Sequence, residues 1–272
     1  MKIIRIFFIP LLATIGLISC SKNSSQNPSV DPAIPPPANS FQLRYSDSVF
    51  YINNQKDYTV SPVEKRTGTY FSFPEGLSLD KKTGEINVSK SDAGLKYRVS
   101  FAESGSKDTV STFILVSGIN YYDGFYVLSK GDSILKPVYN ANKAALIPGI
   151  NNGTVFDVGS SCNDQGCKVS PVNAEINLAQ TVRNGVFGNK PSNNARQEFE
   201  MTYRINDNSG KVDNKLKVKL YYYDSMSDVT QEAFDIINSR TGAIIGPSNV
   251  TSAPLSSAAA KPRPPCIFIV SH

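Results

Sequence analysis

Side chains that could perform catalysis are scarce in this sequence. The sequence contains one histidine, His272, which is its last residue. A serine or cysteine nucleophile that depends on a histidine base is therefore excluded. Two Ser-x-x-Lys matches begin at Ser78 and Ser104, but this motif needs serine and lysine on one helical turn, and both matches fall in predicted strands or turns. The 23 Asp and Glu residues offer no spacing that singles out a carboxylate pair for glycoside cleavage. We expect no catalysis.

Two short motifs could bind a metal ion or form a disulfide. The segment from Asn206 to Asn208 reads Asn-Asp-Asn and could supply oxygens to calcium. Calcium needs about six to eight oxygen ligands from several segments, so a hairpin turn is the better interpretation. Cys162 and Cys167 could close a disulfide loop in an oxidising compartment, or both could be buried free thiols. A cysteine pair without histidine is a poor zinc site, and we expect no metal and no cofactor.

A set of tyrosines near the predicted strand ends has binding potential. Exposed tyrosine rings stack on sugars, so these side chains could form a platform for a glycan. Alternate tyrosines on a strand must face the interior, however, and the sequence contains no tryptophan. Packing in the core is the preferred interpretation, and ligand binding is the alternative. The residues concerned are Tyr121, Tyr122, Tyr126, Tyr221 and Tyr223.

The N-terminal segment indicates where the protein is placed. Lys2 and Arg5 are followed by an almost wholly apolar run over residues 6–18. This run is shorter than the roughly 20 residues of a membrane span and is typical of a secretory signal. The segment ends in Leu-Ile-Ser-Cys20, which resembles the lipobox of bacterial lipoproteins. The resemblance implies that residues 1–19 are removed, that Cys20 is lipidated, and that this lipid anchors the protein in the membrane.

The segment after the lipobox is composed like a tether. Residues 20–40 contain five prolines and many small polar residues, which cannot form a core. In the lipoprotein family, a residue other than aspartate after the lipidated cysteine, here Ser21, favours the outer membrane. We therefore expect a lipid-anchored protein of a Gram-negative cell envelope, at the outer membrane, facing either the periplasm or the exterior. Removal of residues 1–19 takes away Lys2 and Arg5 and leaves 26 Lys and Arg against 23 Asp and Glu, and this net charge of +3 is too weak to indicate nucleic-acid binding.

From residue 41 the pattern changes to short alternating apolar segments separated by turn residues. Leu77 and Leu79 alternate before a turn, and Ile86 and Val88 alternate after it. A period of two, broken by Gly, Asp and Ser, is typical of antiparallel sandwiches. No long helical period interrupts the pattern, and 272 residues suffice for one or two domains. We therefore predict an all-β fold of two tandem Ig-like antiparallel β-sandwich domains.

The first unit also resembles a known kind of module. The stretch from Phe73 to Ile86 reads Phe-Pro-Glu-Gly-Leu-Ser-Leu-Asp-Lys-Lys-Thr-Gly-Glu-Ile, and a Tyr-x-Val strand at Tyr97 and an apolar strand over 113–116 follow it. This order resembles the Ig- and cadherin-like modules of bacterial surface proteins. The resemblance implies a sandwich over residues 41–118. It says little about function, because such modules serve as spacers, adhesins and binding units.

The same pattern returns about 90 residues later. The segment Glu-Ile-Asn-Val at 85–88 is matched by Glu-Ile-Asn-Leu at 175–178. The order and spacing of such matches predict a second, degenerate Ig-like domain over residues 119–225, with a longer insertion over roughly 181–198. Residues 226–272 are predicted to form a short helix and a low-complexity tail, in which 266–270 could be a last strand. The other matches are Gly76 with Gly166, Leu77 with Cys167, Leu79 with Val169, Tyr97, Val99 and Phe101 with Phe199, Met201 and Tyr203, and Phe113 and Leu115 with Leu216 and Val218.

These observations predict a non-catalytic envelope lipoprotein that serves in adhesion, spacing or protein interaction. Its expected partners are the membrane, through the lipid on Cys20, and an envelope protein or glycan that the sequence does not identify. The alternative is a glycan-binding accessory lipoprotein of a nutrient-uptake system, which two or three exposed tyrosines would favour. A second alternative, an envelope hydrolase that uses carboxylates alone, would need two acids converging in a cleft.

Overall fold

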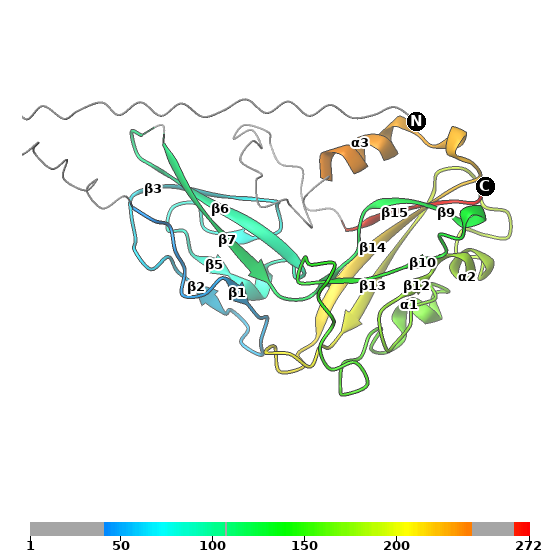
Figure 1. Ribbon diagram of the computed structural model, residues 1–272, viewed down its shortest axis with the longest axis horizontal. Coiled ribbons are helices and arrows are strands. Elements are labelled where there is room, and N and C mark those ends of the chain that lie inside the picture. The colour runs from blue at the N-terminus through cyan, green and yellow to red at the C-terminus, as the bar shows by residue number, and fades with distance from the viewer. Residues whose placement is uncertain (1–40, 107, 241–263) are drawn as a thin grey trace, which may run out of the picture. The chain divides into compact units, whose positions relative to one another are not determined.

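The computed structural model describes residues 41–106, 108–240 and 264–272 (Figure 1). The described residues form mainly strands, with a few short helices, so the predicted all-β fold is confirmed. No described helix has both the length and the apolar character needed to cross a membrane. The predicted signal, the tether and Cys20 lie outside the described residues.

The first sandwich is built from two sheets whose inner faces share one core. A four-stranded sheet has the order β1-β7-β6-β3, and a three-stranded sheet has the order β2-β5-β4. Buried residues alternate along β6, which places Tyr97, Val99 and Phe101 in the core, as the period of two predicts. The strands are β1 (Val49–Phe50), β2 (Thr59–Val60), β3 (Gly68–Phe73), β4 (Ser78–Leu79), β5 (Ile86–Asn87), β6 (Leu95–Glu103) and β7 (Thr109–Val116), and a 3-10 helix η1 (Val88–Lys90) follows β5.

The second sandwich repeats this plan with more loop. Its large sheet has the order β13-β14-β15-β9, and two-stranded sheets pair β10 with β12 and β11 with β8. The strands are β8 (Ile119–Asn120), β9 (Gly124–Val127), β10 (Ile134–Leu135), β11 (Val138–Tyr139), β12 (Ile176–Asn177), β13 (Ala195–Tyr203), β14 (Asn214–Tyr223) and β15 (Cys266–Val270). The helices are η2 (Leu128–Lys130), α1 (Ser161–Asp164), α2 (Leu178–Arg183), η3 (Met226–Asp228) and α3 (Gln231–Arg240).

The hydrogen bonds of the two sandwiches support the predicted repeat. At the start of η1, the Asn87 side chain accepts a hydrogen bond from the Lys90 amide at 3.1 Å. At the start of α2, the Asn177 side chain accepts one from the Gln180 amide at 2.8 Å. The shared Glu-Ile-Asn therefore ends a strand and caps the following helix in both units. Three further pairs of hydrogen bonds match between the two units. The Ser78 amide donates to Ser91 Oγ, as the Lys168 amide donates to Thr181 Oγ1. The backbone bonds, from amide to carbonyl, are Asp80 to Glu85 matched by Ser170 to Glu175, and Tyr70 to Lys81 matched by Phe156 to Pro171.

One expected match in the repeat is wrong by one residue. Phe113 is 39 % exposed, whereas its neighbour Ile114 is buried. Ile114 pairs with Tyr97, and Val218 pairs with Phe199, which is the counterpart of Tyr97. The core-facing match is therefore Ile114 with Val218. Because the whole segment 113–116 is apolar, the pattern alone could not show which residues face inward.

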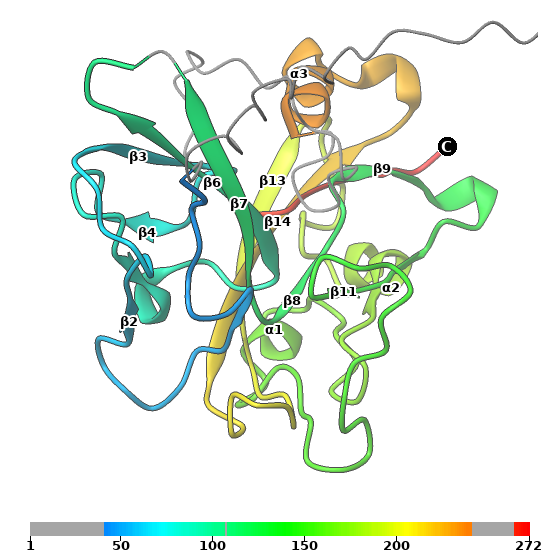
Figure 2. The same ribbon diagram turned by 60° about the vertical axis from the view of Figure 1, so that its left-hand side comes forward.

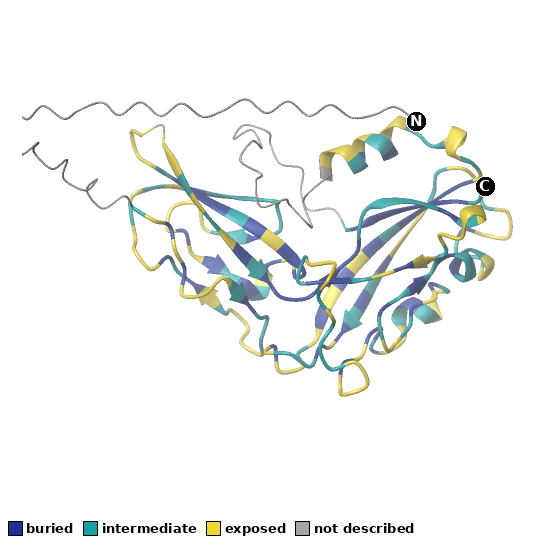
Figure 3. Ribbon diagram, in the orientation of Figure 1, coloured by how far each residue is buried: buried dark blue, intermediate teal, exposed yellow. Residues whose placement is uncertain are grey.

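The structure decides between the two alternatives left open for residues 266–270, a last strand or an apolar end, whereas residues 241–263 of the predicted low-complexity tail lie outside the described residues. The predicted short helix is present as α3, but Cys266–Val270 forms β15, a central strand with a neighbour on each side. All five of its residues are fully buried (Figure 3). Helix α3 packs on the outer face of this sheet, where the ring centroids of Phe234 in α3 and Phe125 in β9 lie 5.0 Å apart. An apolar run of five residues after prolines is too short to distinguish a core strand from an apolar end.

Candidate functional site

Three of the five tyrosines considered for a glycan platform are buried in the structure. Tyr121, Tyr221 and Tyr223 are 0 to 3 % exposed, and Tyr122 and Tyr126 are only partly buried. The Tyr121 hydroxyl donates to the carbonyl of Ala174 at 2.5 Å inside the second core. Alternate residues of a strand face opposite sides of the sheet, and here both sides of β14 are covered. The packing interpretation is correct, and the ligand-facing one is wrong for these three side chains.

The two cysteines of the predicted loop are free and buried rather than bridged. Cys162 lies in α1, and both side chains belong to the second core. Burial raises the pKa of the Cys167 thiol to about 12 and that of Cys162 further still. Thiols in this state are poor nucleophiles, because the thiolate is the reactive form. The repeat explains the result, since Cys167 takes the core position of Leu77 in the first sandwich.

A buried carboxylate beside these cysteines was not anticipated. Asp157 is 5 % exposed, and its carboxylate accepts hydrogen bonds from the amides of Cys162 (2.9 Å) and Asn163 (3.0 Å) and from Asn163 Nδ2 (2.7 Å). Burial opposes ionisation, but these donors outweigh it and hold the pKa of Asp157 below its usual value. Asp157 therefore caps the one-turn helix α1 from outside it, a structural role that its position in the sequence does not reveal.

The Asn-Asp-Asn segment forms the predicted hairpin turn between β13 and β14. The Asp207 carboxylate accepts the Ser209 amide at 2.9 Å, and the Asp207 carbonyl accepts the Gly210 amide at 3.2 Å. The first is the hydrogen bond of an Asx turn, and the second is that of a β-turn. Within the described residues, no three His, Cys, Asp or Glu side chains gather as a possible metal site.

The same aspartate also contacts the link between the two sandwiches. Asp207 Oδ2 accepts hydrogen bonds from the Tyr139 hydroxyl at 2.9 Å and from Ser117 Oγ at 3.2 Å. Ser117 and Gly118 are the only residues between β7 and β8, so they link the two units directly (Figure 2). The Gly118 amide donates to Asn140 Oδ1 at 3.0 Å. We call Ser117, Tyr139, Asn140 and Asp207 the junction network.

Close backbone approach reinforces this junction. A Cβ atom at Gly118 would lie 2.5 Å from the Tyr203 hydroxyl and 2.7 Å from Ala93. The φ of Gly118 is +156°, which side chains rarely adopt, so only glycine fits here. The Tyr203 hydroxyl in turn accepts a hydrogen bond from the Ile119 amide at 3.3 Å. The two sandwiches therefore meet through fixed contacts rather than through a free linker.

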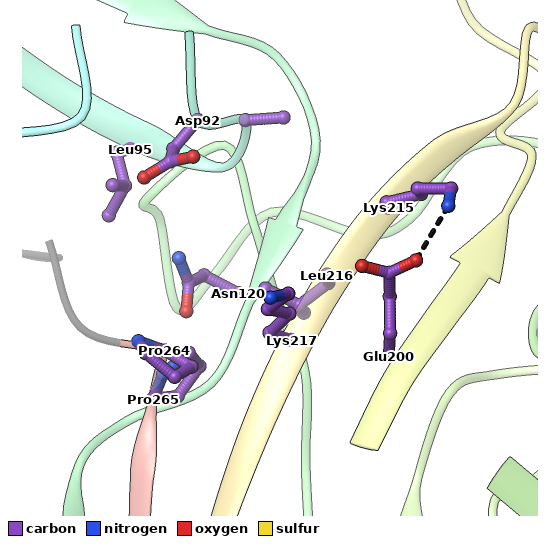
Figure 4. Close-up of a pocket in the computed structure, with 10 residues that line it drawn as sticks. Asp92, Leu95, Asn120, Glu200, Lys215, Leu216, Lys217, Pro264 and Pro265 are labelled. Carbon is purple, nitrogen blue, oxygen red and sulfur yellow. Dashed lines mark hydrogen bonds and ion pairs between the residues drawn. The ribbon is translucent and has the colours of Figure 1, made fainter. Parts of the chain in front are cut away.

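A small cavity lies beside this junction. Its volume is about 250 Å³, below the roughly 300–1,000 Å³ of ligand pockets. Figure 4 shows Asp92 and Glu200 on opposite sides of it, with Glu200 Oε1 in an ion pair with Lys215 Nζ at 2.6 Å. The Glu200 carboxylate is thus engaged by lysine rather than aimed at the other acid. The walls are formed by Asp92, Ala93, Leu95, Asn120, Glu200, Lys215, Leu216, Lys217, Pro264 and Pro265.

Comparison with known proteins finds likeness only to solved structures. No protein-family model matches the chain. No curated protein matches it either. The chain is similar to Drosophila N-cadherin EC1-4, with 14 % identity over 66 % of this chain and 49 % of that one and a TM-score of 0.21. It is also similar to human protocadherin-24 EC1-2, with 12 % identity over 66 % of this chain and 94 % of that one and a TM-score of 0.24. The chain therefore spans about half of the N-cadherin structure, and no function follows from the likeness.

Proposed function

We propose that the protein is a non-catalytic lipoprotein of the cell envelope, tethered through Cys20, that serves in adhesion, spacing or protein interaction. The observation that carries this proposal is the order of the chain: a signal that ends in a lipobox, a proline-rich tether over residues 20–40, and a compact unit of two sandwiches. Lipidation of a cysteine supplies stable membrane binding when several acyl chains are present, since each buried CH₂ contributes about 0.8 kcal/mol.

The junction network supports the spacing and interaction role. Ser117 Oγ, in the two-residue link, donates to Asp207, and Tyr139 donates to the same carboxylate within the second sandwich, so the link is held against the second sandwich. A link held in this way favours a defined spacing between the two sandwiches, whereas flexible linkers allow many spacings. Tyr121 and Tyr221 are buried, so they do not supply the exposed rings that the glycan-binding alternative needs.

Protease treatment of intact cells tests this proposal. An antibody raised against residues 41–240 follows the protein, and a Cys20→Ser chain is the matched control. Digestion without lysis supports adhesion at the exterior, and protection until the outer membrane is opened supports spacing or interaction in the periplasm. Recovery of the wild-type protein in the soluble fraction, as for Cys20→Ser, would contradict the proposal.

A further inference from the structure

Strand β15 occupies a place that β1 holds in the first sandwich. In the first sandwich, β1 pairs directly with β7 in parallel, with Phe50 opposite Val116. Strand β9 is the counterpart of β1, because each begins ten residues before the next strand of its own unit. Strand β1 begins at Val49 and β2 at Thr59, and β9 begins at Gly124 and β10 at Ile134. Strand β9 does not pair with β14, however. Strand β15 lies between them and pairs in parallel with both.

The space between β9 and β14 is therefore a slot shaped for an extended apolar strand. Ile267 and Ile269 of β15 enter the second core. Phe268 lies on the other face, with its ring 4.6 Å from that of Tyr221 and 5.2 Å from that of Phe125. Backbone pairing on both sides fixes the register, and alternate side chains fill pockets on both faces. These are the two elements of recognition by strand addition.

The strand that fills this slot is remote from its neighbours in the sequence. Residues 241–265, 25 in number, separate it from α3. A strand from another molecule competes with the strand of the same chain only when copies are crowded. Anchoring of many copies to one membrane would supply such crowding.

We propose that the slot between β9 and β14 also accepts β15 from a second copy of this chain, so that crowded copies are joined by exchange of this strand. The occupant is argued from the structure, because residues 266–270 are the sequence seen seated in the slot. The inference names a partner for the interaction role and rests on that role. Its test uses purified chain without lipid, so its failure leaves membrane anchoring unaffected and the two failures are distinguishable.

Disulfide trapping can detect a β15 strand from another molecule in the slot. Lys219 is the register partner of Cys266, and the two share a sheet face, so a Lys219→Cys thiol would meet Cys266 of a seated strand. The receiving protein is the full chain with Cys20→Ser, Lys219→Cys, Cys266→Ser and Ile269→Asp, the last change weakening its own β15. The probe is a synthetic peptide of residues 261–272. The control chain carries Lys215→Cys in place of Lys219→Cys, on the same strand but outside the ladder with β15.

The proposal predicts at least tenfold more disulfide-linked peptide on the Lys219→Cys chain than on the Lys215→Cys control. It also predicts a similar loss when the peptide itself carries Ile267→Asp and Ile269→Asp. Equal linkage to both chains by a correctly folded receiver would overturn the proposal.

A second measurement tests the proposal even if the receiving chain with four substitutions fails to fold. Two differently tagged copies that carry only Cys20→Ser and Lys219→Cys, with native Cys266, are mixed at about 1 mM and oxidised. Exchange predicts disulfide-linked dimers that contain both tags and that disappear on hundredfold dilution before oxidation. Intramolecular disulfides alone at the high concentration would overturn the proposal.

Discussion

Replacement of Tyr139 by phenylalanine tests whether the junction network stabilises the protein. Tyr139 is 7 % exposed, and its hydroxyl donates to the Asp207 carboxylate at 2.9 Å. A hydrogen bond to a charged group contributes about 1.5–3 kcal/mol. For a unit of this size, each kcal/mol corresponds to about 2–4 °C in Tm. Tyr139→Phe should therefore lower the Tm at pH 7 by about 4–8 °C, for a loss of about 2 kcal/mol.

The same variant has a defined pH dependence. Burial raises the pKa of Tyr139 to about 12, and the nearby Asp207 carboxylate adds to this effect. Because the folded pKa lies above the unfolded value of about 10, the contribution of the hydroxyl is fully present below pH 10. It is lost as the pH rises from 10 to about 12. The difference in free energy of unfolding between wild type and Tyr139→Phe should therefore be constant up to pH 10 and then narrow.

Thermal and chemical denaturation followed by circular dichroism measure both effects. The matched control is Tyr122→Phe, because the buried Tyr122 hydroxyl has no hydrogen-bond partner in the described structure. Its removal should leave the Tm unchanged or raise it. A Tyr139→Phe chain that melts within 1 °C of wild type, or a difference that persists unchanged to pH 12, would refute the role assigned to the network.

Three further predictions concern the interior of the second sandwich. Asp157→Ala should cost about 2–3 kcal/mol at pH 7 by chemical denaturation, because buried donors lose their acceptor. The pKa of Asp157 is lower in the folded protein than in the unfolded one, so this cost should persist down to the unfolded value of about 3.9 and shrink only as the pH falls further, through the folded pKa; equal stability at pH 7 would contradict the prediction. Phe268→Ala should cost about 3–5 kcal/mol, whereas Leu146→Ala, at a side chain 88 % exposed, should change stability by less than about 0.5 kcal/mol; similar values for the two would contradict the central place of β15. Cys162 and Cys167 should resist iodoacetamide at pH 8 in the native protein and react once guanidinium unfolds it, as mass spectrometry would show; fast native labelling would refute their burial.

The parts of the fold that the sequence predicted correctly depend on local patterns. Alternating apolar residues such as Tyr97, Val99 and Phe101 reported both the strand and its buried face. The order and spacing of alternating apolar pairs around the shared Glu-Ile-Asn predicted the second unit. In the structure Asn87 and Asn177 each cap a helix through the same bond, which needs a particular side chain at one place. The domain boundaries drawn from these patterns stay predictions.

The parts that the sequence did not predict depend on contacts between distant residues. The position of β15 is decided by pairing with β9, more than 100 residues earlier, and no local period reports a partner so remote. Asp207 lies in a turn motif that accounts for it fully, so its second role toward Tyr139 left no trace in the spacing. The tyrosine platform failed for a related reason. Both faces of β14 are covered, one by the core and the other by α3, and alternation indicates a buried face only when the other is exposed.

The central claim, that a lipid on Cys20 anchors these sandwiches in the envelope, is tested most directly by mass spectrometry of the N-terminus. Cells that express the wild-type chain, or the Cys20→Ser chain, are grown with an alkyne-tagged palmitate analogue, and the protein is purified. The proposal predicts a mature wild-type chain that begins at Cys20 and carries the tagged acyl chains, and a Cys20→Ser chain without label. A wild-type chain that retains residues 1–19 or begins at Cys20 without acyl groups would contradict it.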